Sequence, residues 1–381
     1  MVYLKMNDFN KEIIPGEIEN GSHKRLRPCA EEESVTTSML DACERGDLNT
    51  VQLLIQNEKQ LLTQHSMATQ PLNTVTYQDE ITGLSPLMMA AKNGHLELCQ
   101  LLIQEGAPWN AIDRTGNCAG NYATNQGHWD IVNFLVDVGV QAELILGMAI
   151  RNDKSSRQKH TLGDGGGGLP FDYDSHTKPD YIHRHVRYNL NNTALLDQDN
   201  DAVMMEWERP LMEAHAHIIT SNGHENKRVL NVGFGMGIID TILQNLSPSL
   251  HVIVEAHPLV YKKMLDDGWD QKKNVRLLFG KWQDVLPQLI LNEHITFDGI
   301  FYDTYGEHFT DFEDFHSNII TQCLAENGVY SFFNGLCPDN LFFHGVACQC
   351  IQLQLGMLGF DCEFIGTLTL FLCYDHMNDL V

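Results

Sequence analysis

In this 381-residue chain, three glycines and one carboxylate are the residues whose spacing most clearly suggests a ligand-binding site. An apolar run ends at Gly233, Gly235 and Gly237 and passes into an apolar helical pattern. Glycines let a backbone turn tightly and approach a ligand closely. A second apolar run ends at Glu255, 22 residues after Gly233, where a carboxylate is placed to accept both hydroxyls of a ribose. The pattern predicts a site for a nucleoside.

The spacing of the glycines narrows the kind of nucleoside. The loop reads Gly-x-Gly-x-Gly, whereas dinucleotide-binding loops read Gly-x-Gly-x-x-Gly. It contains no basic residue and no Gly-Lys-Ser/Thr, so a phosphate cradle is not predicted. These features favour S-adenosylmethionine, which has a ribose but no phosphate. The alternative is a packed glycine turn in an α/β protein that binds no nucleoside.

Two acidic residues have places suited to a cationic methyl acceptor. Asp303 ends an apolar run, where a carboxylate is costly unless it is paired or faces a ligand. Glu208 lies just before Pro210, which suits the first turn of a helix. A guanidinium stays protonated in water, so methyl transfer to it needs carboxylates that bind its donors and accept the released proton. We assign Glu208 and Asp303 to that chemistry, with a structural helix cap as the alternative for Asp303.

The elements that must position these residues alternate between strands and helices. Strands are predicted near 228–233, 251–256, 275–280, 297–303, 328–334 and 362–370, with helices between them. This alternation indicates a doubly wound, mostly parallel sheet, in which ligands bind at the carboxyl ends of the strands. At that edge Trp282 is placed to cover an adenine ring, and Gln283 or Asp284 to accept its amino group. A place in the core is the alternative for Trp282.

The N-terminal part of the chain repeats itself. Residues 82–95 and 115–128 share a pattern 33 residues apart, and the Gly-His pair in each precedes an apolar helix, over 96–104 and 129–137. A degenerate earlier copy covers 39–55. This period and its Gly-x-(Ser/Thr)-Pro-Leu signature resemble ankyrin repeats. Two to three repeats are barely enough to stand alone, so we expect this module to lean on another domain.

The repeats have no residues that suggest catalysis. His95 and His128 are interpreted as residues that brace the loops between helices. Residues 142–152 predict a separate helix that caps the stack. Ankyrin stacks bind proteins, so the expected role is recognition of a substrate or partner.

Composition limits the kinds of partner. Fifty acidic residues against 25 Lys and Arg give a formal net charge of -25, which opposes nucleic acid and anionic membranes and favours basic partners. The ten cysteines are scattered, with no CxxC pair and no His at zinc spacing, so reduced thiols and no metal site are expected. No signal peptide or apolar span of membrane length is visible. We therefore expect a protein of the cytoplasm, the nucleus or both, as a monomer or weak dimer.

Changes in composition mark the expected boundaries. Residues 1–34 predict a flexible tail, 35–152 the repeat domain, 153–180 a glycine-rich linker, and 181–381 the domain with the glycine loop.

Five motifs in order point to a known family. They are Val203-Met-Met-Glu-Trp-Glu208, Asn231-Val-Gly-Phe-Gly-Met-Gly237, Val254-Glu-Ala-His257, Phe279-Gly-Lys-Trp-Gln-Asp-Val285 and Phe301-Tyr-Asp-Thr-Tyr305. They resemble guanidinoacetate N-methyltransferase and, more closely, the protein arginine N-methyltransferase 2 family, over roughly residues 36–370. That family modifies the internal δ-nitrogen of protein arginine and carries ankyrin repeats before its catalytic domain. The resemblance implies a Rossmann-like class I S-adenosylmethionine methyltransferase domain (α/β) preceded by an all-α ankyrin domain.

The resemblance also implies roles for individual residues. Glu208 and Asp303 act on the guanidino group, Asn334 and Gly335 contact the substrate, and Tyr181 belongs with Tyr188 to a segment that folds over the cofactor. Contacts with S-adenosylmethionine, whose product is S-adenosylhomocysteine, are implied at Tyr188, Met204, Met212, Phe234, Gly235, Met236, Gly237, Ile238, Ile239, Glu255, Ala256, His257, Trp282, Gln283 and Asp303. Glu255 would hold the ribose, and Phe234 to Ile239 the methionine part. The implied partner is a basic, arginine-containing protein, bound in part by the repeats.

The C-terminal end departs from the family pattern. The family continues after residue 370 into a closing strand, whereas residues 371–381 have no such pattern. An alternative isoform or a mispredicted gene end would explain this, and losing a central strand would cost several kcal/mol of stability. An inactive ankyrin scaffold with a truncated methyltransferase fold therefore stays open as one alternative function. Methylation of a small guanidino compound is the other, although a small substrate needs no protein-binding stack.

Overall fold

The chain forms two compact units. The computed structural model describes residues 30–64, 74–152, 178, 180–221, 226–333, 336–337 and 340–364, without the side chains of 30–34, 37, 62–64 and 148–152. The repeat unit contains the described residues between 30 and 152 together with those between 336 and 353. The sheet unit contains the described residues between 178 and 333 together with 354–364. No helix in this part of the chain is long and apolar enough to cross a membrane.

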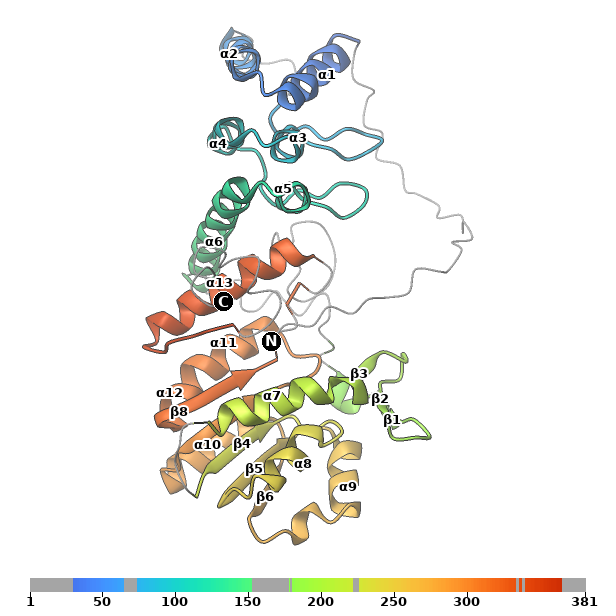
Figure 1. Ribbon diagram of the computed structural model, residues 1–381, viewed down its shortest axis with the longest axis vertical. Coiled ribbons are helices and arrows are strands. Elements are labelled where there is room, and N and C mark those ends of the chain that lie inside the picture. The colour runs from blue at the N-terminus through green and yellow to red at the C-terminus, as the bar shows by residue number, and fades with distance from the viewer. Residues whose placement is uncertain are drawn as a thin grey trace, which may run out of the picture. The chain divides into compact units, whose positions relative to one another are not determined.

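Helices packed in pairs make up most of the repeat unit (Figure 1). The helices are α1 (Ala30–Arg45), α2 (Leu48–Gln64), α3 (Pro86–Lys92), α4 (Leu96–Gln104), α5 (Ala119–Gln126) and α6 (Trp129–Asn152). Ser85 caps α3, because its Oγ accepts the N–H of Met88 at 3.2 Å, and Pro86 fills the first turn. The predicted helix over 96–104 is confirmed as α4. Helix α1 begins at Ala30, inside the predicted tail, whose residues 1–29 lie outside the described part.

The two histidines of the Gly-His pairs brace neighbouring repeats, as predicted. His95 Nε2 lies 3.1 Å from the carbonyl oxygen of Glu44, and His128 Nε2 lies 3.2 Å from that of Lys92. The ring of His128 also packs so closely on Gly94 that a Cβ there would lie 2.7 Å from it. Each ring therefore donates to a carbonyl at a helix end of the preceding repeat, where such carbonyls lack helical partners.

The predicted capping helix over 142–152 is not separate, because α6 continues without a break from Trp129 to Asn152. Gly139 lies inside this helix, and a Cβ there would lie 2.8 Å from the ring of Trp109. In a sequence a glycine suggests the end of a helix, but here the lack of a side chain lets the ring of Trp109 pack against the helix.

Helix α13 (Leu341–Met357) belongs to the repeat unit as far as Leu353. A Cβ on Gly120 would lie 2.2 Å from the ring of Phe342, and the rings of Phe343 and Trp109 meet edge to face at 5.8 Å. Asn340 Nδ2 donates to Asn121 Oδ1 at 2.8 Å. The sequence analysis placed residues 181–381 in one domain, whereas the described residues between 336 and 353 group with the repeat unit. Nothing in the repeat pattern marks this grouping.

The sheet unit is a Rossmann-like α/β domain. Its five-stranded parallel sheet has the order β6-β5-β4-β7-β8. The strands are β4 (Arg228–Val232), β5 (Leu250–Glu255), β6 (Val275–Phe279), β7 (Phe297–Tyr302) and β8 (Leu324–Phe332). This confirms five of the predicted strands. Of the sixth, near 362–370, residues 362–364 are not in a strand and 365–370 lie outside the described part.

Helices cover both faces of this sheet (Figure 1). On one face lie α7 (Arg209–Ile219), α8 (Ile238–Asn245), α9 (Pro258–Asp266) and η4 (Trp269–Gln271). On the other lie α10 (Trp282–Glu293), α11 (Phe309–Phe315), the π-helix η5 (His316–Ile320) and α12 (Thr321–Cys323). The strand order reverses direction at β4, so the carboxyl ends of β4 and β7 lie side by side, where ligands bind in such sheets.

A small antiparallel sheet leads into this edge. It consists of β1 (Arg187–Tyr188), β2 (Ala194–Leu196) and β3 (Ala202–Met205), with the short helix η2 (Tyr181–His183) before it. After β3 the chain passes through η3 (Glu206–Glu208) directly into α7, whose first turn holds Pro210 as predicted. Glu208 therefore stands at the N-terminus of α7.

Candidate active site

The glycine loop joins the ends of β4 and β7. Gly233 has a φ of +97°, and a Cβ added to it would lie 1.9 Å from the carbonyl oxygen of Asp303. The N–H of Asp303 donates to Val232 O at 3.0 Å. Only glycine allows this approach, so the first glycine of the loop sets the position of the predicted catalytic aspartate.

Glu255, at the end of β5, is buried and held by the backbone. Its Oε2 accepts the N–H of Phe234 at 3.0 Å, and its Oε1 accepts the N–H of His257 at 2.6 Å. Burial raises the pKa of the Glu255 carboxyl. Since a carboxylate oxygen accepts more than one hydrogen bond, both oxygens retain capacity for the hydroxyls of a ribose.

His257 connects this carboxylate to the segment 180–188. Its Nδ1 accepts the N–H of Leu259 at 3.2 Å, which caps α9, and its Nε2 lies 3.0 Å from Arg184 O. A ring that accepts at Nδ1 and faces a carbonyl at Nε2 has its proton on Nε2. The ring of Tyr181 packs on His257 with centroids 4.9 Å apart. Burial lowers the pKa of His257, consistent with a neutral ring.

Two residues from the small sheet contact the glycine loop. The hydroxyl of Tyr188 donates to Gly235 O at 2.9 Å. The Sδ of Met204 lies 3.3 Å from the backbone N of Met236 and would lie 2.9 Å from a Cβ on Gly235. The structure therefore brings these predicted cofactor residues together around one loop.

Glu208 and Asp303 influence each other electrostatically. Burial raises the pKa of the Asp303 carboxyl to about 7, and the negative charge of Glu208 adds to the rise. Glu208 Oε1 accepts the N–H of Met205 at 2.9 Å, which fixes its side chain against the end of β3. A carboxyl whose ionisation is disfavoured by burial and by a neighbouring carboxylate suits a site for a cation that also loses a proton.

Residues at the start of α10 surround Glu307. Gln283 Nε2 donates to Glu307 Oε1 at 3.2 Å and to Asp311 Oδ1 at 3.3 Å, and Trp282 Nε1 donates to Glu307 Oε1 at 3.1 Å. Tyr302 also donates to Glu307 Oε2, at 2.5 Å. Because two carboxylates require a donor, the amide nitrogen of Gln283 must face them. Its Oε1 is then turned away, and this buried oxygen has no hydrogen-bond partner among the residues that the structure describes.

Some predicted residues lie deeper than a ligand contact requires. Met212 is fully buried and Trp282 is 4 % exposed, each within a core cluster on one face of the sheet. Ile238 and Ile239 belong to the same cluster as Met212, while Ala256 is only partly buried beside Glu255. The roles implied for these residues stay predictions. Asn334 and Gly335 lie outside the described residues.

The predicted site residues do not include Lys178, Glu307 or Tyr305, which contact the site elements. Tyr305 ends one of the five family motifs but was given no role, and the sequence signal for Glu307 is that it follows Asp303 closely. Lys178 has none, because its partners Asp197 and Asp201 come 19 and 23 residues later, after β1 and β2.

The residues present fit S-adenosylmethionine. The unpaired Oε1 of Gln283 provides an acceptor for an adenine amino group, and Glu255 provides one for ribose hydroxyls. Among the described residues no group of three or more His, Cys, Asp or Glu side chains is arranged to hold a metal ion.

Comparison with known proteins agrees with this geometry. The guanidinoacetate N-methyltransferase family matches residues 171–342, and a model of three ankyrin repeats matches residues 39–144. A protein arginine N-methyltransferase 2 of Candida glabrata is 36 % identical over 295 residues, which cover 71 % of this chain and 71 % of the relative.

The chain belongs to the protein arginine N-methyltransferase 2 family. Two further members show the same extent of similarity. That of Eremothecium gossypii is 32 % identical over 333 residues, covering 75 % of this chain and 79 % of the relative. That of Saccharomyces cerevisiae is 32 % identical over 289 residues, covering 71 % and 70 %. Family membership confirms the predicted arrangement of ankyrin repeats followed by a Rossmann-like methyltransferase domain.

Proposed function

We propose that this protein transfers a methyl group from S-adenosylmethionine to the guanidino group of arginine, at the δ-nitrogen, in a basic protein. The observation that carries the proposal is Asp303 beside the glycine loop, with its pKa raised to about 7 by burial and by the charge of Glu208. The names of the relatives, which are protein arginine N-methyltransferases 2, support the choice of arginine.

The chain's own residues would hold the cofactor at three points. Glu255 accepts the ribose hydroxyls, Gln283 Oε1 accepts the adenine amino group, and the loop from Phe234 to Gly237 lies along the methionine part. When bound, S-adenosylmethionine supplies an electrophilic methyl group on a sulfonium.

The two carboxylates would then bind and deprotonate the acceptor. Glu208, fixed by the Met205 N–H, accepts hydrogen bonds from the guanidinium and holds one face of it. Asp303 accepts further donors and takes up the proton that leaves the methylated nitrogen, since a carboxyl with a pKa near 7 is matched to that transfer at neutral pH. Holding the nitrogen close to the methyl carbon provides the rest of the acceleration.

The charge of the chain supports a basic partner. A formal net charge of -25 attracts arginine-rich proteins over long distances. The repeat unit, whose family binds proteins through such stacks, is the part that we assign to substrate recognition.

The deciding experiment combines product analysis with a binding measurement. The protein is incubated with methyl-labelled S-adenosylmethionine and an arginine-rich protein, and the product is digested and analysed by mass spectrometry for δ-methylarginine against terminal-nitrogen methylarginine. We expect label on the δ-nitrogen, and methyl on a terminal nitrogen would overturn the position proposed. If no arginine is methylated, calorimetry with S-adenosylhomocysteine and with Glu255→Ala distinguishes an inactive scaffold from an enzyme offered the wrong protein.

Methylation of a small guanidino compound is the second candidate. The match of residues 171–342 to the guanidinoacetate N-methyltransferase family favours it. To separate the two functions, guanidinoacetate is offered alone and in competition with the protein substrate. Only a small-molecule enzyme would have a higher kcat/KM for guanidinoacetate than for the protein.

A further inference from the structure

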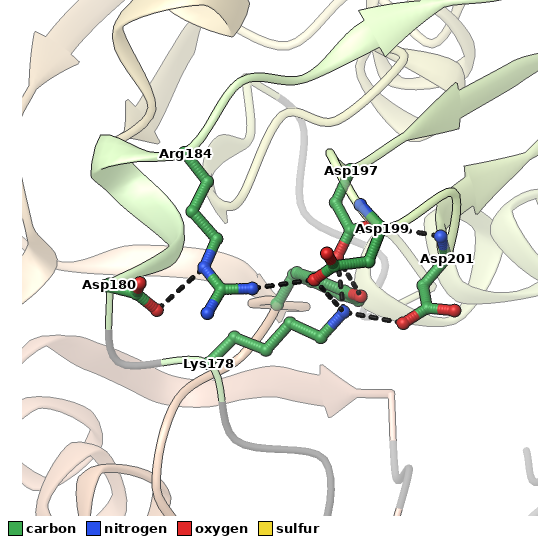
Figure 2. A network of polar contacts seen from close by, with 7 residues as sticks. Lys178, Asp180, Arg184, Asp197, Asp199 and Asp201 are labelled. Carbon is green, nitrogen blue, oxygen red and sulfur yellow. Dashed lines mark hydrogen bonds and ion pairs between the residues drawn. The ribbon is translucent and has the colours of Figure 1, made fainter.

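A lysine and three aspartates form a junction in the sheet unit, outside the residues assigned to chemistry. The Nζ of Lys178 contacts Asp197 most closely, lies 2.7 Å from Asp201 Oδ2 and 3.9 Å from Asp199 Oδ2 (Figure 2). The Asp197 side chain is completely buried and that of Lys178 is 18 % exposed. Ion pairs at a surface contribute little, but a buried carboxylate needs its partner.

Asp197 joins three separate segments of the chain. Its Oδ1 accepts the N–H groups of Asp199 and Asp201, both at 2.9 Å, which shapes the turn between β2 and β3. Its Oδ2 accepts Lys178 Nζ and, at 3.3 Å, the hydroxyl of Tyr305. The turn, the segment that begins at Lys178 and the loop after β7 therefore meet at one side chain.

Each of these segments leads directly to a site residue. The turn continues through β3 to Met204 and Glu208. The loop after β7 contains Asp303, two residues before Tyr305. The backbone of Lys178 is tied to the same loop, since its N–H donates to Gly306 O at 2.8 Å.

The junction also reaches the ribose end of the site. Lys178 O accepts the N–H of Tyr181 at 2.8 Å, and the ring of Tyr181 packs on Tyr305 and on His257, with centroids 4.9 Å apart in each case. Arg184 Nη1 donates to Asp199 Oδ2 at 2.7 Å (Figure 2), while its carbonyl accepts from His257.

We propose that Lys178 and Asp197 are positioning residues, whose contact fixes the loop of Asp303 relative to Glu208 and holds the segment 180–188 beside His257. The inference rests on the proposed function, because it gives the junction a purpose in methyl transfer. Displacement of a reacting group by about 1 Å costs roughly 100-fold in rate, so a contact that holds two loops in register acts on catalysis without touching the substrate.

The test uses Lys178→Met, Lys178→Arg and the double variant Lys178→Met/Asp197→Asn. In the double variant the buried charge is gone, and the asparagine that replaces Asp197 retains an oxygen for the N–H groups of Asp199 and Asp201. The control is Lys262→Met, which removes an exposed lysine 3.6 Å from Asp266 on α9. Thermal unfolding, the dissociation constant of S-adenosylhomocysteine and kcat for methyl transfer are measured for each.

We expect Lys178→Met to lower kcat about 100-fold and to weaken S-adenosylhomocysteine binding about 10-fold, with Lys178→Arg closer to the wild type. The double variant should regain most of the thermal stability but not kcat, whereas a merely structural role predicts that both return together. Wild-type kcat and affinity in Lys178→Met, or recovery of kcat in the double variant, would overturn the inference. Failure of the proposed function looks different, because the wild type itself then transfers no methyl group while the ranking of S-adenosylhomocysteine affinities still tests the junction.

Discussion

The repeat unit and the sheet unit use aspartate in different ways, as a comparison of Asp113 with Asp303 shows. Burial alone would raise the pKa of Asp113, but hydrogen bonds from Tyr122 and Thr115 bring it below the ordinary value. Burial and the charge of Glu208 raise the pKa of Asp303 to about 7. Hydrogen bonds favour the charged form of the carboxyl in the repeat unit, whereas burial and a neighbouring charge disfavour it in the sheet unit.

Uncharged polar side chains show the same contrast. His95 and His128 close hydrogen bonds to backbone carbonyls within the repeats, and their neighbours are structural. In the sheet unit the buried Oε1 of Gln283 has no hydrogen-bond partner within the described part of the chain. A buried acceptor that the described residues leave unpaired is available to a donor on a ligand.

Of the variants considered, Glu208→Gln should cause the largest loss of methyl transfer. It removes the charge that binds the guanidinium while keeping an oxygen for the Met205 N–H, so we expect kcat/KM for methyl transfer to fall by about 10²- to 10³-fold. S-adenosylhomocysteine affinity, measured by calorimetry, should change little. The matched control is Glu206→Gln in the same turn, which loses only its 2.6 Å ion pair with Arg209. Equal losses in both variants would show that the general charge of the turn matters, not Glu208.

Gly233→Ala compared with Gly127→Ala tests the glycines of the two units. Both have positive φ, but a Cβ at Gly127 meets nothing within 4 Å, whereas one at Gly233 would lie 1.9 Å from Asp303 O. We expect Gly127→Ala to lower the free energy of unfolding by about 1 kcal/mol and Gly233→Ala by roughly 2–4 kcal/mol, with loss of methyl transfer. Urea unfolding measures both. Similar losses of stability would mean that the close approach at Gly233 relaxes easily.

The pH dependence follows from the opposite shifts of the two aspartates. Asp303 must be ionised to bind a guanidinium and accept a proton, so log(kcat/KM) should rise with a slope near 1 up to about pH 7 and then level off. Asp113, with its lowered pKa, stays ionised over this range, and stability that depends on it is lost only at acid pH. The measurements are initial rates between about pH 5.5 and 9 and thermal unfolding over the same range. In Glu208→Gln the remaining activity should reach its plateau at lower pH, because the charge that raises the Asp303 pKa is gone.

The sequence predicted the parts of this protein that have a period or a motif. Five strands, the glycine loop, Glu255 and the bracing role of His95 and His128 all follow from local patterns. The sequence analysis divided α6 into two helices. Glycine often ends a helix, but Gly139 lies inside α6 because its missing side chain makes room for the ring of Trp109. The junction at Lys178 and the hydrogen bonds around Glu307 join segments that meet only in the folded chain, so the spacing of residues in the sequence does not predict them.

Gln283→Met, compared with Asp284→Asn, should give the smallest effect and tests the adenine end of the site. The sequence allows either residue to accept the adenine amino group, but Asp284 is exposed whereas Gln283 presents a buried, unpaired oxygen. Loss of one hydrogen bond of about 1 kcal/mol should weaken S-adenosylhomocysteine binding roughly 5-fold in Gln283→Met and leave it unchanged in Asp284→Asn. Calorimetry with the deaminated analogue, S-inosylhomocysteine, sharpens the result. The wild type should prefer S-adenosylhomocysteine because Glu307 and Asp311 hold the amide with its oxygen towards the ligand, and Gln283→Met should lose that preference. A preference that persists in Gln283→Met and disappears in Asp284→Asn would assign the adenine contact to Asp284 instead.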